Sequence, residues 1–187
     1  MNKARHLPGD LAVWLIILAE LLAFAILFVV FAVTRARNPG LFAESQQSLD
    51  TSMGVVNTLL LIGGSWCVAR AVQATAANER KVGLSWLAIA QACGVGFVVL
   101  KLSEYSAKAA AGIDLETNVF FMFYFLLTGF HFLHVLAAMV FLTFLMVMLW
   151  RSRDVRPRIH ALETAAAFWH MVDLLWIVLF PLVYIVR

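Results

Sequence analysis

The chain has 187 residues, of which 63% are hydrophobic and only 13% are Asp, Glu, Lys or Arg. That charged fraction is about half of what a soluble domain carries, which excludes a soluble globular domain, a disordered chain and a nucleic-acid-binding protein. The net charge of +3 comes from 14 Lys and Arg against 11 Asp and Glu. In so apolar a chain this excess is expected to set the orientation in a membrane. We therefore predict a single membrane domain over residues 1–187.

Five runs of residues are long and apolar enough to cross a bilayer as helices. The spans are predicted at approximately 11–33, 51–73, 82–104, 118–150 and 163–186. The fourth run is the longest, because no Lys, Arg, Asp or Glu occurs from Thr117 to Trp150. Only Thr128 and Gly129 offer a polar turn there, and a turn at membrane depth leaves backbone groups unpaired. We predict one tilted helix instead, and hence an all-α, polytopic membrane protein with five transmembrane helices.

The basic residues predict the orientation of these spans. Nine lie in the N-terminus and the second and fourth loops with their flanks, namely Lys3, Arg5, Arg70, Arg80, Lys81, Arg151, Arg153, Arg156 and Arg158. The other five lie in the first and third loops and at the C-terminus. Because loops rich in Lys and Arg stay in the cytoplasm, we expect the N-terminus in the cytoplasm and the C-terminus on the outer side of the membrane. A cleaved signal peptide is disfavoured, because Glu20 would interrupt its apolar region.

Ionisable side chains within the spans are the candidate functional residues, because a membrane makes them costly unless they are paired. Their depth, at about 1.5 Å per residue, divides them into two clusters. The proton-handling cluster of the cytoplasmic half is predicted to contain Glu20, Glu163, His170 and Asp173, and the outer-half cluster Glu104, His131 and His134. Glu20 and His170 lie at similar depth, so we expect them to be bridged directly or through water.

The third span carries its own charge compensation. Lys101, Glu104 and Lys108 are spaced three and four residues apart, so they share one face of a helix. An ion pair within this helix is therefore predicted to neutralise Glu104.

Three interpretations of the polar residues stay open. They can hydrogen-bond one another and fix the packing of the helices. A buried carboxyl group can also hold a proton near neutral pH, because burial disfavours its charged form. The third is a metal centre, but the chain lacks the Glu-x-x-His pairs of di-iron bundles, and a b-type haem would depend on His134 and His170 alone as axial ligands. We expect no catalytic residue, no metal and no haem.

Three segments, KLSEYS (Lys101–Ser106), TGFHFLHV (Thr128–Val135) and FWHMVDLLWIVLFPLVY (Phe168–Tyr184), resemble subunit III of haem-copper oxidases in order and spacing. The first span, LAELLAFAILF (Leu18–Phe28), resembles a helix of that family with an acidic residue where Glu20 stands. The chain is similar to the short, five-helix form of the family, which is bacterial, so the resemblance implies a protein of the bacterial inner membrane with its C-terminus in the periplasm. This resemblance implies two bundles, the first two spans against the last three, with a V-shaped cleft between them that holds lipid. A structural phospholipid is then the only bound group expected.

The resemblance also implies a function. The implied function is to serve as a non-catalytic subunit or accessory protein that assembles with a haem-copper-type catalytic subunit (subunit I) and contacts membrane lipids. The start of the chain, LPGDLAVWLIILAEL (Leu7–Leu21), is most similar to an accessory protein of nitric oxide reductase operons, the NorE type, so we expect support of nitric oxide reductase in denitrification. The alternative is subunit III of an aerobic cytochrome c or quinol oxidase, which aids proton uptake and stabilises the complex. An independent metal- or haem-binding membrane oxidoreductase is an alternative of a different class.

Overall fold

A computed structural model describes residues 11–152 and 154–186, and all its regular elements in this part of the chain are helices. They are α1 (Leu11–Arg37), α2 (Pro39–Gln47), α3 (Thr51–Ala76), α4 (Arg80–Ala110), α5 (Val119–Arg151), the 3-10 turn η1 (Arg156–Arg158), α6 (Ile159–Phe180) and the π-helical turn η2 (Pro181–Ile185). Five segments of the described chain are long and apolar enough to cross a membrane. The predicted all-α class and the five spans are confirmed.

The spans differ from the predicted ones mainly at their ends. Helix α5 continues through Thr128 and Gly129 without a turn, as predicted. Helix α2 was not predicted; it follows Asn38 and has Pro39 in its first turn, where the missing N–H has no helical partner in any case. At the other end of the chain, Pro181 removes a backbone donor, and α6 passes there into a π-helical turn.

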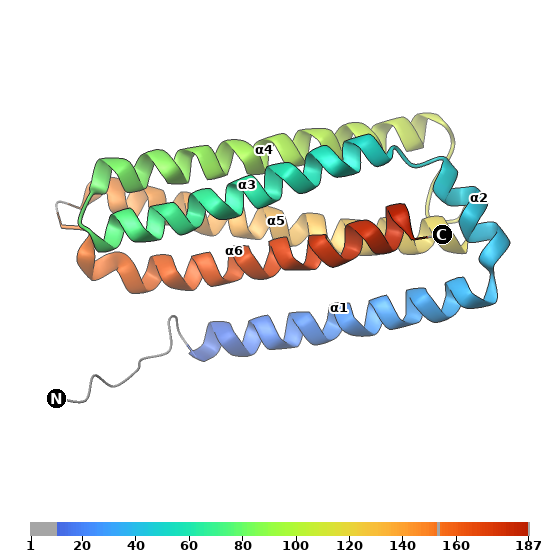
Figure 1. Cartoon of the computed structure of the whole chain (residues 1–187), viewed down its shortest axis with the longest axis horizontal. Helices are drawn as coiled ribbons and strands as arrows, with labels where there is room; N and C mark the ends of the chain where they lie inside the picture. The colour runs from blue at the N-terminus through green and yellow to red at the C-terminus, as the bar shows by residue number, and fades with distance from the viewer. Residues whose placement is uncertain (1–10, 153, 187) are drawn as a thin grey trace.

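Helices α3, α4, α5 and α6 form an antiparallel four-helix bundle, and α1 runs along its side against α6 and α5 (Figure 1). The predicted division into two and three spans is therefore wrong, because α3 packs on α4 and α6 rather than pairing with α1. Small residues let α3 and α4 approach closely. A Cβ atom added at Gly64 of α3 would lie 3.3 Å from the Cβ of Cys93, and one at Gly83 of α4 would lie 3.0 Å from Oγ1 of Thr75.

Helix α1 is attached to the bundle by one narrow stripe. Ile17, Phe24 and Phe31 are its buried residues, and their spacing of seven places them on one face. The ring of Phe24 meets Phe130 of α5 edge to face at 6.4 Å, and Phe31 meets Phe123 in the same way at 5.8 Å. Most other apolar side chains of α1 are exposed, so much of its surface is available to lipid or to another protein.

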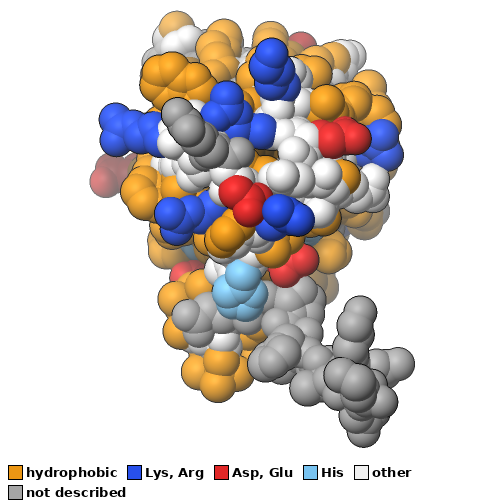
Figure 2. All heavy atoms as spheres, turned by 90° about the vertical axis from the view of Figure 1, so that its left-hand side faces the viewer, with side chains coloured by type: hydrophobic (Ala, Val, Ile, Leu, Met, Phe, Trp, Pro, Cys, Tyr) orange, Lys and Arg blue, Asp and Glu red, His pale blue; other side chains and the backbone are white. Residues whose placement is uncertain are grey.

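At one end of the bundle, the α3–α4 turn and the start of α4 are hydrogen-bonded to the α5–α6 connection. Asn78, in the turn between α3 and α4, has a positive φ of 61°, a conformation that asparagine tolerates. Its side-chain oxygen accepts a hydrogen bond of 3.2 Å from the backbone N–H of Val155. Arg80 donates to the carbonyl of Ser152 at 2.9 Å. Figure 2 shows this end of the molecule, on which Lys and Arg side chains gather.

Helix α2 fastens the opposite end. The buried amide of Gln46 donates to the carbonyls of Val183 at 2.8 Å and Val186 at 3.0 Å. These carbonyls belong to the end of the last span, where the α-helical hydrogen bonds have stopped. Lys108 of α4 also donates to the carbonyl of Ser48, just after α2. The short helix therefore connects α1 to the ends of α4 and α6.

Candidate functional site

Glu20 of α1 forms an ion pair with His134 of α5. The distance between Oε2 of Glu20 and Nε2 of His134 is 3.1 Å. The other ring nitrogen, Nδ1, lies 2.7 Å from the carbonyl of Phe130, and a carbonyl requires a donor, so Nδ1 carries hydrogen. Nε2 is the nitrogen that faces the carboxyl group of Glu20, so this contact joins α1 to α5.

The predicted bridge between Glu20 and His170 is not formed. Nδ1 of His170 lies 2.5 Å from Oγ of Ser65 on α3, whereas α1 packs on α6 and α5. His170 and Asp173 remain neighbours on α6, but Glu163 is partly exposed near the start of this helix and has no hydrogen bond to either residue in the described part of the chain. The predicted cytoplasmic-half cluster is therefore not one group, because Glu20 pairs with His134 of α5 and His170 with Ser65 of α3.

A second polar site lies between α3 and α6. Ser65 and Asp173 are buried there beside His170. Within the described residues, Oδ1 of Asp173 and Nε1 of Trp169 are buried without a hydrogen-bond partner. Both residues line a narrow void shared with Leu61 of α3. Among the described residues, an acceptor and a donor thus both lack a partner at one void, which is rare for buried polar groups.

The predicted ion pair of the third span is confirmed, and it is the centre of a larger network. Lys101 is fully buried, and its ammonium group donates to Oε2 of Glu104 at 3.0 Å and to the hydroxyls of Tyr124 at 3.2 Å and Tyr184 at 2.7 Å. Tyr184 in turn donates to Oε1 of Glu104 at 2.8 Å. The ring of Trp176 lies 5.6 Å from the ammonium nitrogen, within the range of a cation–π interaction. Tyr124 and Tyr184 were not among the predicted site residues, although a tyrosine hydroxyl within an apolar span indicates a polar partner there.

Of the other members of the predicted outer-half cluster, His131 meets this network through the ring of Trp176, whereas His134 pairs with Glu20. His131 is fully buried, and its Nε2 donates to the carbonyl of Val172 at 3.0 Å. Its ring also contacts Trp176, with centroids 4.9 Å apart. Side chains three residues apart on an α-helix point in directions that differ by about 60°. His131 therefore faces α6, whereas His134 reaches Glu20 on α1. Glu104, His131 and His134 thus belong to three separate contacts.

The hydrogen bonds of His134 and His170 bear on the two alternatives considered from the sequence, a metal centre and a b-type haem. Both ring nitrogens of His134 are engaged, and His170 is bonded to Ser65. Across residues 11–152 and 154–186, no group of three or more His, Cys, Asp or Glu side chains is placed to hold a metal ion. The histidines named here are engaged in hydrogen bonds with protein groups.

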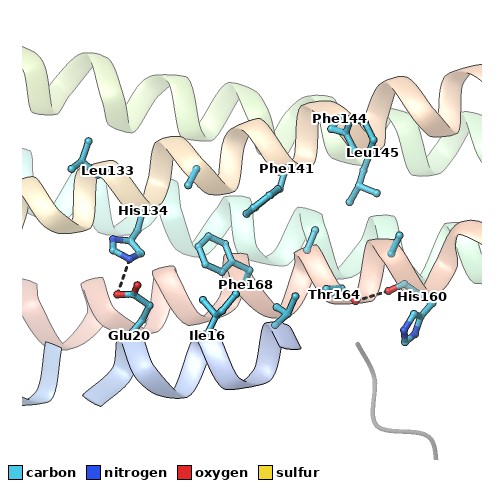
Figure 3. A pocket seen from close by; sticks show the side chains of 14 residues that line it. Ile16, Glu20, Leu133, His134, Phe141, Phe144, Leu145, His160, Thr164 and Phe168 are labelled. Carbon is cyan, nitrogen blue, oxygen red and sulfur yellow. Dashed lines mark hydrogen bonds and ion pairs between the residues drawn. The ribbon is translucent and has the colours of Figure 1, made fainter. Parts of the chain in front are cut away.

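A cavity of about 680 Å³ lies between α1, α5 and α6. Figure 3 shows Glu20 and His134 pointing toward each other at one end, and Thr164 and His160 at the other. The wall between them is apolar and includes Ile16, Leu133, Phe141, Phe144, Leu145 and Phe168. The cavity separates α1 from the bundle, and so differs from the predicted cleft between the first two and the last three spans.

Comparison with known proteins agrees with this architecture. Residues 9–187 match the family described as cytochrome c oxidase subunit III. The chain belongs to this family. Cytochrome c oxidase subunit 3 of Synechocystis sp. is 34% identical, over 91% of this chain and 72% of that protein. A probable cytochrome c oxidase subunit 3 of Mycobacterium bovis is 28% identical over 100% of this chain and 91% of its own length, and cytochrome bo(3) ubiquinol oxidase subunit 3 of Pseudomonas aeruginosa is 24% identical over 92% and 82%. The resemblance inferred from the three motif segments is thereby confirmed at the level of the family.

Proposed function

We propose that the chain is a non-catalytic membrane subunit that assembles with the haem-copper catalytic subunit of a bacterial respiratory oxidase and supports its turnover. The observation that carries this proposal is the family match over residues 9–187. The names of the relatives describe third subunits of cytochrome c and ubiquinol oxidases, which favours an oxygen-reducing partner. The pairing of Glu20 with His134, and of Lys101 with Glu104, within one chain suits a subunit whose polar groups serve packing and proton exchange.

Nitric oxide reductase is the second candidate partner. The similarity of residues 7–21 to the NorE-type accessory protein favours it. Of these residues, 11–21 form the start of α1, and 7–10 lie outside the described residues. Both candidates give the chain the same supporting role, and they differ in whether the partner reduces oxygen or nitric oxide.

Deletion of the chain is expected to slow respiratory turnover without abolishing it, because the chemistry takes place in the partner. The test measures oxygen consumption and nitric oxide consumption in membranes of the deletion strain and of the same strain carrying the gene on a plasmid. The haem content of the catalytic subunit serves as the control for assembly. A slowed oxygen reaction identifies an oxidase partner, and a slowed nitric oxide reaction identifies a reductase. Complete loss of turnover with a haem-loaded catalytic subunit would contradict a supporting role.

We further propose that the N-terminus lies in the cytoplasm and the C-terminus in the periplasm of the inner membrane. The start of α1, the α3–α4 turn and the α5–α6 connection lie at one end of the bundle (Figure 1), and this end carries the gathered Lys and Arg side chains (Figure 2). Positive loops favour the cytoplasm. A cysteine placed at Gly112 should react with a membrane-impermeant maleimide in intact spheroplasts, and one at Asn78 only after lysis. Wild-type protein, with Cys67 and Cys93, gives the background, and the reverse pattern of labelling would invert the topology.

A further inference from the structure

The cavity between α1, α5 and α6 has the properties of a site for a small apolar molecule with one polar head. Its volume of about 680 Å³ falls within the roughly 300–1,000 Å³ of ligand pockets in proteins. Along α6 it extends from His160 to Phe168, which is about 12 Å at about 1.5 Å per residue. Such pockets combine an apolar wall with a few placed polar groups, and here the inner end is formed by Glu20 and His134.

The ion pair presents one further acceptor to this cavity. His134 uses Oε2 of Glu20, and a carboxylate has lone pairs on both oxygens, so Oε1 can accept a hydrogen bond from a ligand. The carboxyl group is 32% exposed, whereas the imidazole is 14% exposed. The imidazole is fixed by its bond to the carbonyl of Phe130, so the carboxyl group of Glu20, which lines the cavity, is held in place.

These groups discriminate between the molecules that a membrane supplies. A phosphate would be repelled by Glu20 at the inner end, and a phospholipid would therefore keep its headgroup near the exposed Arg156 and Arg158 of η1. Its acyl chain would then meet the ion pair and leave the second carboxyl oxygen without a partner. A neutral head with a hydroxyl donor satisfies that oxygen instead. The rings of Phe141, Phe144 and Phe168 line the same space and suit contact with an aromatic ring.

We propose that this cavity binds a membrane-soluble hydroquinone, with one ring hydroxyl donating to Oε1 of Glu20, the ring against the phenylalanines, and the apolar tail leading out between α1 and the bundle. The proposal concerns binding alone and does not depend on which catalytic subunit is the partner. It is tested with the purified full chain and no catalytic subunit, so its failure leaves the proposed function untouched.

The test uses the full chain in nanodiscs of synthetic phosphatidylcholine, titrated with decylubiquinol kept reduced under argon. We expect saturable binding of one molecule per chain. Ala137 lines the cavity, so Ala137→Phe should fill it and weaken binding by about tenfold or more, since an occupied pocket leaves the ligand no buried wall. Ala92 is exposed on α4 and outside the cavity, so Ala92→Phe is the matched control and should bind like the wild type.

The hydrogen bond from the ligand to Glu20 is tested separately from the volume of the cavity. Glu20→Leu should weaken binding by about tenfold or more, the effect expected for a hydrogen bond to a charged group. Glu20→Gln keeps a carbonyl oxygen for the ligand and an amide for His134, so its affinity should stay within about threefold of the wild type. The dimethyl ether of decylubiquinol has no hydroxyl donor and should bind about tenfold more weakly than the hydroquinone.

Several results would overturn the proposal. They are the absence of saturable binding, equal affinities of Ala137→Phe and Ala92→Phe, and equal binding of the dimethyl ether and the hydroquinone. Native mass spectrometry of the same samples can give a further result that would overturn the proposal. A retained phospholipid that decylubiquinol does not displace from the wild type, and that Ala137→Phe does displace, would assign the cavity to a lipid chain.

Discussion

Replacement of Lys101 by methionine is expected to lower the free energy of unfolding by about 3–5 kcal/mol, as for other buried ion pairs from which one partner is removed. The carboxylate of Glu104 is only 4% exposed, and it would lose its counter-ion without gaining water. The hydroxyls of Tyr124 and Tyr184 would lose the same donor. The measurement is unfolding of the purified chain in mixed micelles with increasing dodecyl sulfate, followed by circular dichroism.

Lys108→Met is the matched control on the same helix. Lys108 is only partly buried and donates to the carbonyl of Ser48, so its loss should change stability by about 1 kcal/mol or less. A double variant, Lys101→Met with Glu104→Gln, should recover much of the lost stability, because the neutral amide can still accept a hydrogen bond from Tyr184 and leaves no buried charge. Equal effects at positions 101 and 108 would show that the buried pair does not stabilise the bundle.

The contacts that were predicted correctly from the sequence lie within single helices. The spans follow from the length of each apolar run, and the ion pair of Lys101 with Glu104 follows from a spacing of three on one helix. Likewise, the absence of a turn at Thr128 and Gly129 follows from the cost of unpaired backbone groups in a membrane. In each case the local geometry of the helix fixes the answer.

The contacts that were predicted wrongly lie between helices. Residue counting from the helix start gave the same depth for Glu20 and His170, but it carried no information on which faces of α1, α3 and α6 meet. It also assumed that all spans start in one plane, whereas the 33-residue α5 is the longest helix and brings His134 level with Glu20. Helix α2 escaped prediction because its anchor, the bond of Gln46 to the carbonyls that follow α6, joins positions more than 130 residues apart.

Replacement of Gly54 by alanine is expected to destabilise the chain by about 1–3 kcal/mol, the usual effect of overfilling a packed core. A Cβ atom added there would overlap the ring of Phe180, with Cδ2 only 2.9 Å away. Gly63 is the matched control on the same helix, because an added Cβ atom meets nothing within 4 Å. Gly63→Ala should leave stability unchanged or raise it slightly, since alanine is the better helix former. The same unfolding titration measures both variants.

The origin of the effect can be tested through Phe180. This ring is buried at 7% exposure and lies 5.4 Å from the ring of Tyr184, so it has little room to turn away. Phe180→Leu removes the ring carbons that an alanine at position 54 would meet, and Gly54→Ala should therefore cost less in that background than in the wild type. Tyr184 also donates to Glu104, so displacement of Phe180 should disturb the network of Lys101. Gly54→Ala and Lys101→Met are thus expected to be non-additive, the double variant losing less stability than the sum of the two single losses, and strict additivity would show that the two sites act independently.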